Sequence, residues 1–98
     1  MKKIHEMADR MEDELADALH YAENYVLCKA HGNIPSANRY KEMASDELKH
    51  AGYVRDFTDQ EIENIQKVYV LPVETHDMWE RAQRIFSEKS AITRQMLS

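Results

Sequence analysis

The stretch from Met7 to Cys28, MADRMEDELADALHYAENYVLC, decides the fold class of this chain. Its apolar and aromatic residues recur at intervals of three and four positions, the period of an amphipathic α-helix. Neither glycine nor proline interrupts it. The complete apolar stripe consists of Ile4, Met7, Met11, Ala18, Tyr21, Tyr25 and Cys28. We therefore predict a helix over residues 4–30.

The segment that follows this helix carries the signals of a turn and of a second helix start. Residues 31–36 include a glycine and a proline, and Ser36 is suited to capping the next helix. Apolar residues at helical spacing then predict a second helix over residues 36–66. The sequence Thr58-Asp-Gln-Glu61 has the form of a capping box, so this helix either continues through residue 58 or breaks there.

The last third of the chain predicts an extended link and a third helix. Residues 68–73 are apolar, and Pro72 disfavours helix at the residue before it. Apolar residues at helical spacing recur over residues 74–96 and predict the third helix there. With only two glycines and two prolines among 98 residues, the chain lacks the turns of an all-β fold. We expect one all-α domain spanning residues 1–98.

The arrangement of these helices predicts self-association. The helices at 4–30 and 36–66 are joined by a short loop, so we expect an antiparallel hairpin. A two-helix hairpin leaves much of its apolar surface uncovered, and one further helix covers only part of it. We therefore expect a homodimer that completes a four-helix bundle.

Charge and composition exclude several other classes of function. Thirteen Lys and Arg against eighteen Asp and Glu give a net charge of −5, which argues against general nucleic-acid binding. The longest apolar run, residues 68–73, is far shorter than the roughly 20 residues of a membrane span. A single cysteine forms no internal disulfide. We expect a cytoplasmic protein that binds neither nucleic acid nor membrane.

Three polar residues interrupt the apolar stripes of the predicted hairpin. Glu14 lies on the stripe of the first helix, and Glu47 and His50, three positions apart, share a face of the second. Glu14 and Glu47 are equally far from the turn at residues 30–31, so an antiparallel hairpin brings them to the same height. Carboxylates inside a bundle are costly unless they are paired or bind a cation.

Dimerisation doubles this set to four glutamates and two histidines. That is the ligand inventory of di-iron and di-manganese carboxylate bundles, where four carboxylates neutralise two divalent ions. Oxygen and imidazole donors suit iron or manganese. We predict a dinuclear site formed by Glu14, Glu47 and His50 of both subunits. Two alternatives remain: a metal-free assembly or adaptor domain whose Glu–His cluster sets the dimer register, and a structural or Mn/Zn dinuclear site.

The same residues resemble those of the ferritin-like superfamily. Residues 14–23, ELADALHYAE, and 42–51, EMASDELKHA, look like the first helical hairpin of rubrerythrins and bacterial ferritin-like proteins. The likeness covers about the first 55 residues. The chain length, with one hairpin and a third helix, is similar to the half-length encapsulated ferritins, which build a di-iron site between two subunits.

This resemblance implies a function in iron homeostasis. Glu14, Glu47 and His50 would be iron ligands, Tyr21 an aromatic residue near the site, and Asp46 a partner that orients a ligand histidine. The implied activity is that of a ferroxidase, which oxidises two Fe(II) ions per dimer with oxygen or peroxide. A larger ring of dimers and an enclosing protein shell are further implied assemblies, although residues 92–98 show no shell-docking tail.

Overall fold

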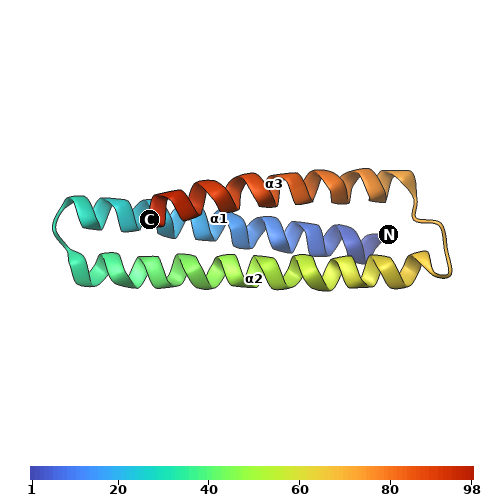
Figure 1. Cartoon of the computed structure of the whole chain (residues 1–98), viewed down its shortest axis with the longest axis horizontal. Coiled ribbons are helices and arrows are strands. Elements are labelled where there is room, and N and C mark those ends of the chain that lie inside the picture. The colour runs from blue at the N-terminus through green and yellow to red at the C-terminus, as the bar shows by residue number, and fades with distance from the viewer.

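The computed structural model describes residues 1–98 and consists of three α-helices without a strand. They are α1 (Lys2–Ala30), α2 (Ile34–Gln66) and α3 (Val73–Leu97). The helices run alternately up and down along a rod of 55 × 19 × 17 Å (Figure 1). The predicted all-α class is confirmed, and each helix begins and ends within two residues of its predicted bounds.

The turn between α1 and α2 differs in one detail from the prediction. Asn33, not Ser36, caps α2: its side-chain oxygen accepts a hydrogen bond of 3.3 Å from the backbone N–H of Ser36. Pro35 fits inside the first helical turn, where its missing N–H has no intrahelical acceptor to lose. Gly32 supplies the positive φ of 77° that reverses the chain. The helix therefore begins at Ile34.

The second helix is continuous through Thr58, which settles the alternative that the sequence left open. Thr58 is fully buried, and its hydroxyl donates a hydrogen bond of 2.7 Å to the carbonyl of Val54, one turn earlier. The threonine thus satisfies its hydroxyl inside the helix and does not start a new one. A single helix of 33 residues results.

The core stripe of α1 shares Ile4, Met11, Ala18 and Tyr25 with the predicted one and includes Ala8, Leu15 and Ala22 in place of Met7, Tyr21 and Cys28. The buried α1 residues follow an alternating spacing of four and three: Ile4, Ala8, Met11, Leu15, Ala18, Ala22 and Tyr25. The facing residues of α2 are Ala37, Ala44, Leu48, Ala51, Val54, Thr58 and Ile62. Because many of these side chains are alanines, the two helix backbones can approach closely. The larger side chains of the predicted stripe, such as Met7 and Tyr21, lie at its edge.

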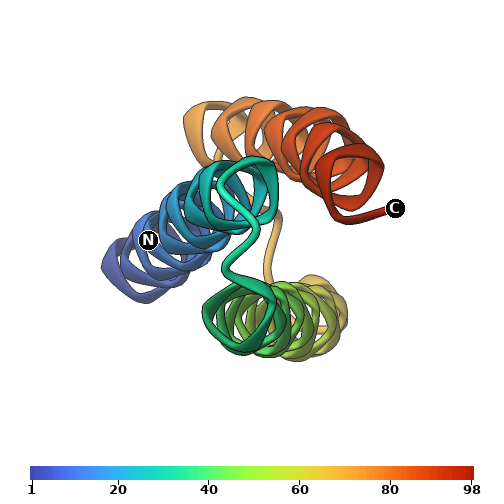
Figure 2. The same cartoon turned by 90° about the vertical axis from the view of Figure 1, so that its left-hand side faces the viewer.

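Helix α3 packs on α1 and makes only limited contact with α2 (Figure 2). Two interactions link α3 to α2. The Trp79 indole N–H donates a hydrogen bond of 2.8 Å to Asp59, and the Arg55 guanidinium lies 4.5 Å from the centre of the Phe86 ring. These contacts place α3 along one side of the α1–α2 hairpin and leave the opposite side of the hairpin without a covering helix.

Replacing Leu15 by alanine should destabilise the chain strongly, because Leu15 is fully buried where α1 packs against α2. We call this line of contact between the two helices the seam. We expect a loss of about 2–5 kcal/mol in the free energy of unfolding, measured by urea denaturation. The matched control is Leu27→Ala on the same helix, whose side chain is largely exposed, with an expected change within about 0.5 kcal/mol. Equal losses in the two variants would contradict the observed core.

Candidate metal centre

Glu14 lies on α1 at the border between the buried seam and the uncovered side of the hairpin. Its side chain is 16% exposed, and Oε1 lies 3.7 Å from Nε of Arg10, one turn earlier. The second carboxylate oxygen, Oε2, is buried and has no hydrogen-bond partner. Since Arg10 is itself two-thirds exposed, this ion pair is weak. Glu14 therefore retains an unsatisfied anionic oxygen.

Glu47 and His50 form a pair on one face of α2. The Glu47 Oε1 atom lies 3.4 Å from Nδ1 of His50, with side-chain exposures of 22% and 53%. The three-residue spacing brings the two side chains together on the helix surface. No other hydrogen bond or ion pair engages them within the chain, so Glu47 Oε2 and His50 Nε2 are free to bind a ligand.

The structure brings the three predicted residues together in part. Glu14 of α1 and His50 of α2 line the same hollow of about 220 Å³, together with Arg10, Tyr53 and Val54. Glu47 adjoins this hollow through its contact with His50. Within one chain, however, no three His, Cys, Asp or Glu side chains form a group that could hold a metal ion. The chain by itself presents an incomplete ligand set.

In the single chain these residues lie beside the core, and their predicted place in the core of a dimeric bundle stays a prediction. Leu15 and Leu48 occupy the central positions beside Glu14 and Glu47, and His50 is exposed. The core side chains next to them, Leu15 and Leu48, are 0% and 8% exposed, whereas the side chains of Glu14 and Glu47 are 16% and 22% exposed. The candidate ligands thus lie at the surface of the single chain.

Apolar side chains surround the candidate ligands on the uncovered side of the hairpin. We call this surface the open face; its apolar members are Met7, Tyr21, Tyr40, Met43 and Phe57. Met43 and Phe57 are 41% and 50% exposed. The Tyr21 and Tyr40 rings lie 6.3 Å apart, centroid to centroid. Met7, Tyr21 and Tyr40 are partly buried against the core of the chain, so Met43 and Phe57 are the exposed apolar side chains of this face.

The two supporting residues that the resemblance implies lie in different environments. Tyr21 is half-buried on the open face, seven residues after Glu14 and hence on the same side of α1. Asp46 is exposed and makes no hydrogen bond or ion pair within the chain. Its role toward a histidine stays a prediction. The sequence reasoning missed Arg10, although its spacing of four residues from Glu14 is the signal for an ion pair on a helix.

Known proteins supply no counterpart of this site. No protein-family model, curated protein or solved structure matches the chain. None of its helices combines the length and apolar character that crossing a membrane requires.

Replacing Glu14 by leucine should stabilise the chain in the absence of metal, because it removes a buried carboxylate oxygen that has no partner. With a chelator present and the chain concentration fixed, we expect a gain of about 1–3 kcal/mol in the free energy of unfolding. The control is Glu12→Leu, an exposed position on the same helix, with little expected change. A lower stability of the Glu14 variant would instead show that its carboxylate supports the fold.

Proposed function

We propose that this chain is the subunit of a homodimeric, ferritin-like ferroxidase whose two iron ions are bound by Glu14, Glu47 and His50 of both subunits. The observation that carries this proposal is the unpartnered Oε2 atom of Glu14, buried at the edge of an exposed apolar face. A buried anionic oxygen without a hydrogen bond is costly, and a bound cation removes that cost.

A second copy supplies what the single chain lacks. Two-fold pairing of the open faces would bury Met43 and Phe57 and place two Glu14 residues opposite two Glu47–His50 pairs. The resulting four carboxylates and two imidazoles are the ligand set of dinuclear carboxylate centres in four-helix bundles. A metal site shared between two subunits requires that each chain hold only part of the ligand set, as this chain does.

The donor atoms present fit iron. Carboxylate oxygens and imidazole nitrogen bind Fe(II) and also Mn(II), whereas thiolate-rich sites select softer ions. The contact from Glu47 Oε1 to His50 Nδ1 orients the imidazole and leaves its Nε2 atom available. The negative charge of four carboxylates compensates the positive charge of two metal ions and favours the higher oxidation state.

In the proposed reaction, Fe(II) is the substrate. Each of two Fe(II) ions gives up one electron, and O₂ takes the two electrons with two protons to form hydrogen peroxide. When hydrogen peroxide is the oxidant, two electrons and two protons convert it into two water molecules. The protein residues hold the two ions side by side and balance the charge that oxidation adds.

One contact favours an alternative in which no metal binds. Arg10 already lies 3.7 Å from Glu14 and partly neutralises it, as expected of a metal-free assembly or adaptor domain that pairs through the open face. A structural Mn or Zn centre is a second alternative, because oxygen and imidazole donors also bind these ions. The two alternatives differ from the ferroxidase in iron content and in iron oxidation.

An anaerobic Fe(II) titration of the metal-free protein tests the proposal, followed by addition of oxygen. We expect saturation at about one iron per chain and Fe(III) formation faster than in buffer, because each dimer holds two ions. Glu47→Ala should lose both the iron binding and the accelerated formation of Fe(III). Glu63→Ala serves as the control, since Glu63 is an exposed glutamate on the same helix without an ion pair.

Two other outcomes would overturn the ferroxidase proposal. If the unmodified chain binds no iron, Glu14, Glu47 and His50 belong to a metal-free dimer interface. Iron binding without accelerated oxidation would instead favour a structural centre, and the same titration with Mn(II) and Zn(II) would identify the preferred ion.

A further inference from the structure

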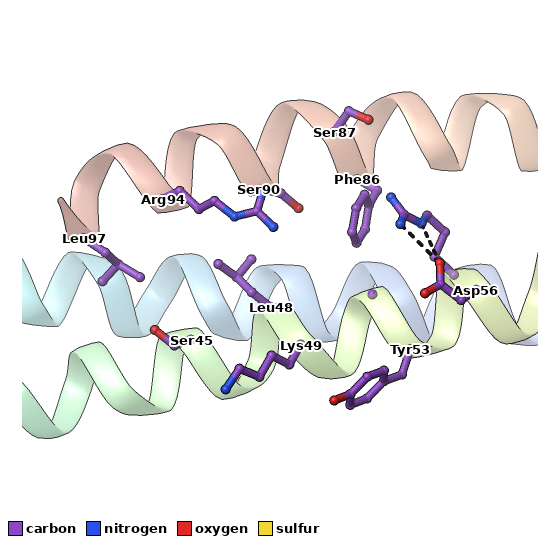
Figure 3. A pocket seen from close by; sticks show the side chains of 12 residues that line it. Ser45, Leu48, Lys49, Tyr53, Asp56, Phe86, Ser87, Ser90, Arg94 and Leu97 are labelled. Atoms are coloured by element: carbon purple, nitrogen blue, oxygen red, sulfur yellow. Dashed lines mark hydrogen bonds and ion pairs between the residues drawn. The ribbon is translucent and has the colours of Figure 1, made fainter.

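A groove of about 660 Å³ runs between α2 and α3, away from the open face (Figure 3). It exists because these two helices make only limited contact with each other. Its volume lies within the range of about 300–1,000 Å³ that is usual for small-molecule sites. The apolar residues Leu48, Phe86 and Leu97 line it, surrounded by polar and charged side chains.

Ser90 contributes an unsatisfied hydroxyl to this groove. The residue is 1% exposed, and its Oγ atom is buried without a hydrogen-bond partner. The neighbouring Thr93 donates its hydroxyl to the carbonyl of Lys89, one turn earlier, over 2.8 Å. Ser90 makes no such bond, and Figure 3 shows its oxygen pointing from α3 toward the space between the helices. A buried hydroxyl in this state is ready to bind a ligand atom.

The charged side chains around Ser90 make the groove positive. Arg94, one helical turn after Ser90, and Lys49 of α2 form no ion pair within the chain, whereas Arg55 pairs with Asp56 at 3.2 Å. The lining thus holds three cations and one carboxylate in a chain whose net charge is −5. A positive groove on an acidic protein favours an anionic ligand.

We infer that this groove binds a small organic oxyanion, a metabolite that bears a carboxylate or phosphate group. Arg94 presents a guanidinium suited to two hydrogen bonds with such a group, and the Ser90 hydroxyl donates a third. Lys49 adds charge at the rim, and Leu48 and Phe86 contact the organic part of the ligand. This site lies on the other side of α2 from the candidate metal centre and shares only Tyr53 with the hollow there.

Isothermal titration calorimetry of the metal-free protein with citrate and with inorganic phosphate tests this inference and separates the two oxyanion chemistries. We expect at least one probe to bind, and Arg94→Ala to weaken that binding at least about tenfold, because it removes a charge-assisted bidentate contact. Arg84→Ala, an exposed arginine of the same helix outside the groove, should leave affinity unchanged.

A second variant separates binding from folding. Ser90→Ala should weaken binding several-fold, yet its melting temperature should equal or exceed that of the unmodified chain, because it removes an unsatisfied buried hydroxyl. Failure of both probes to bind, or equal affinity of Arg94→Ala, would overturn the inference. A change of molar mass in Arg94→Ala without anion binding would also overturn it and identify the groove as an interface between copies.

Discussion

The close packing of α1 against α2 through small side chains is the constraint on which the rest of the structure depends. Ala18, Ala22, Ala44 and Ala51 are completely buried where the helices meet. Small side chains let two helix backbones approach, and the close contact gains dispersion energy along the seam. Larger side chains such as Met11 and Leu15 are also buried there, whereas Met7 and Tyr21 lie at its edge.

This arrangement places the candidate ligands where a second subunit can complete them. Glu14 is held at the edge of the seam by its neighbour Leu15, and the Glu47–His50 pair occupies the corresponding edge of α2. Only 21 of 98 residues are buried, a small core for a chain that must fold by itself. Pairing through the open face would enlarge that core and satisfy the free oxygen of Glu14 in one step.

The sequence allowed the helices to be predicted well and the seam only in part. Three- and four-residue spacing predicts α1, α2 and α3, since helix formation follows local periodicity. It cannot decide between two adjacent stripes on one helix, because that choice depends on how closely the facing helix packs. Met7 and Tyr21 are as regularly spaced as Ala8 and Ala22, but the two alanines are the buried ones. The prediction therefore identified only part of the core stripe.

The candidate site, too, could be predicted from the sequence only in part. Glu14, Glu47 and His50 could be singled out from sequence because polar residues interrupt an apolar pattern, and their spacing predicts that they lie at one level of the hairpin. Their environment could be predicted only in part: the four-residue spacing signals the Arg10 contact, whereas the free Glu14 oxygen follows from side-chain packing. The Ser90 hydroxyl carries no sequence signal at all, since a serine within a helix usually satisfies itself with a carbonyl one turn earlier.

The central claim is that one chain holds half of a metal site and that iron joins two copies. Sedimentation equilibrium of the metal-free protein, with and without anaerobic Fe(II), tests it most directly. The account predicts that Fe(II) lowers the dissociation constant of the dimer, because iron binds the paired state in preference. An iron-bound monomer, or a dimer dissociation constant that Fe(II) leaves unchanged, would contradict it.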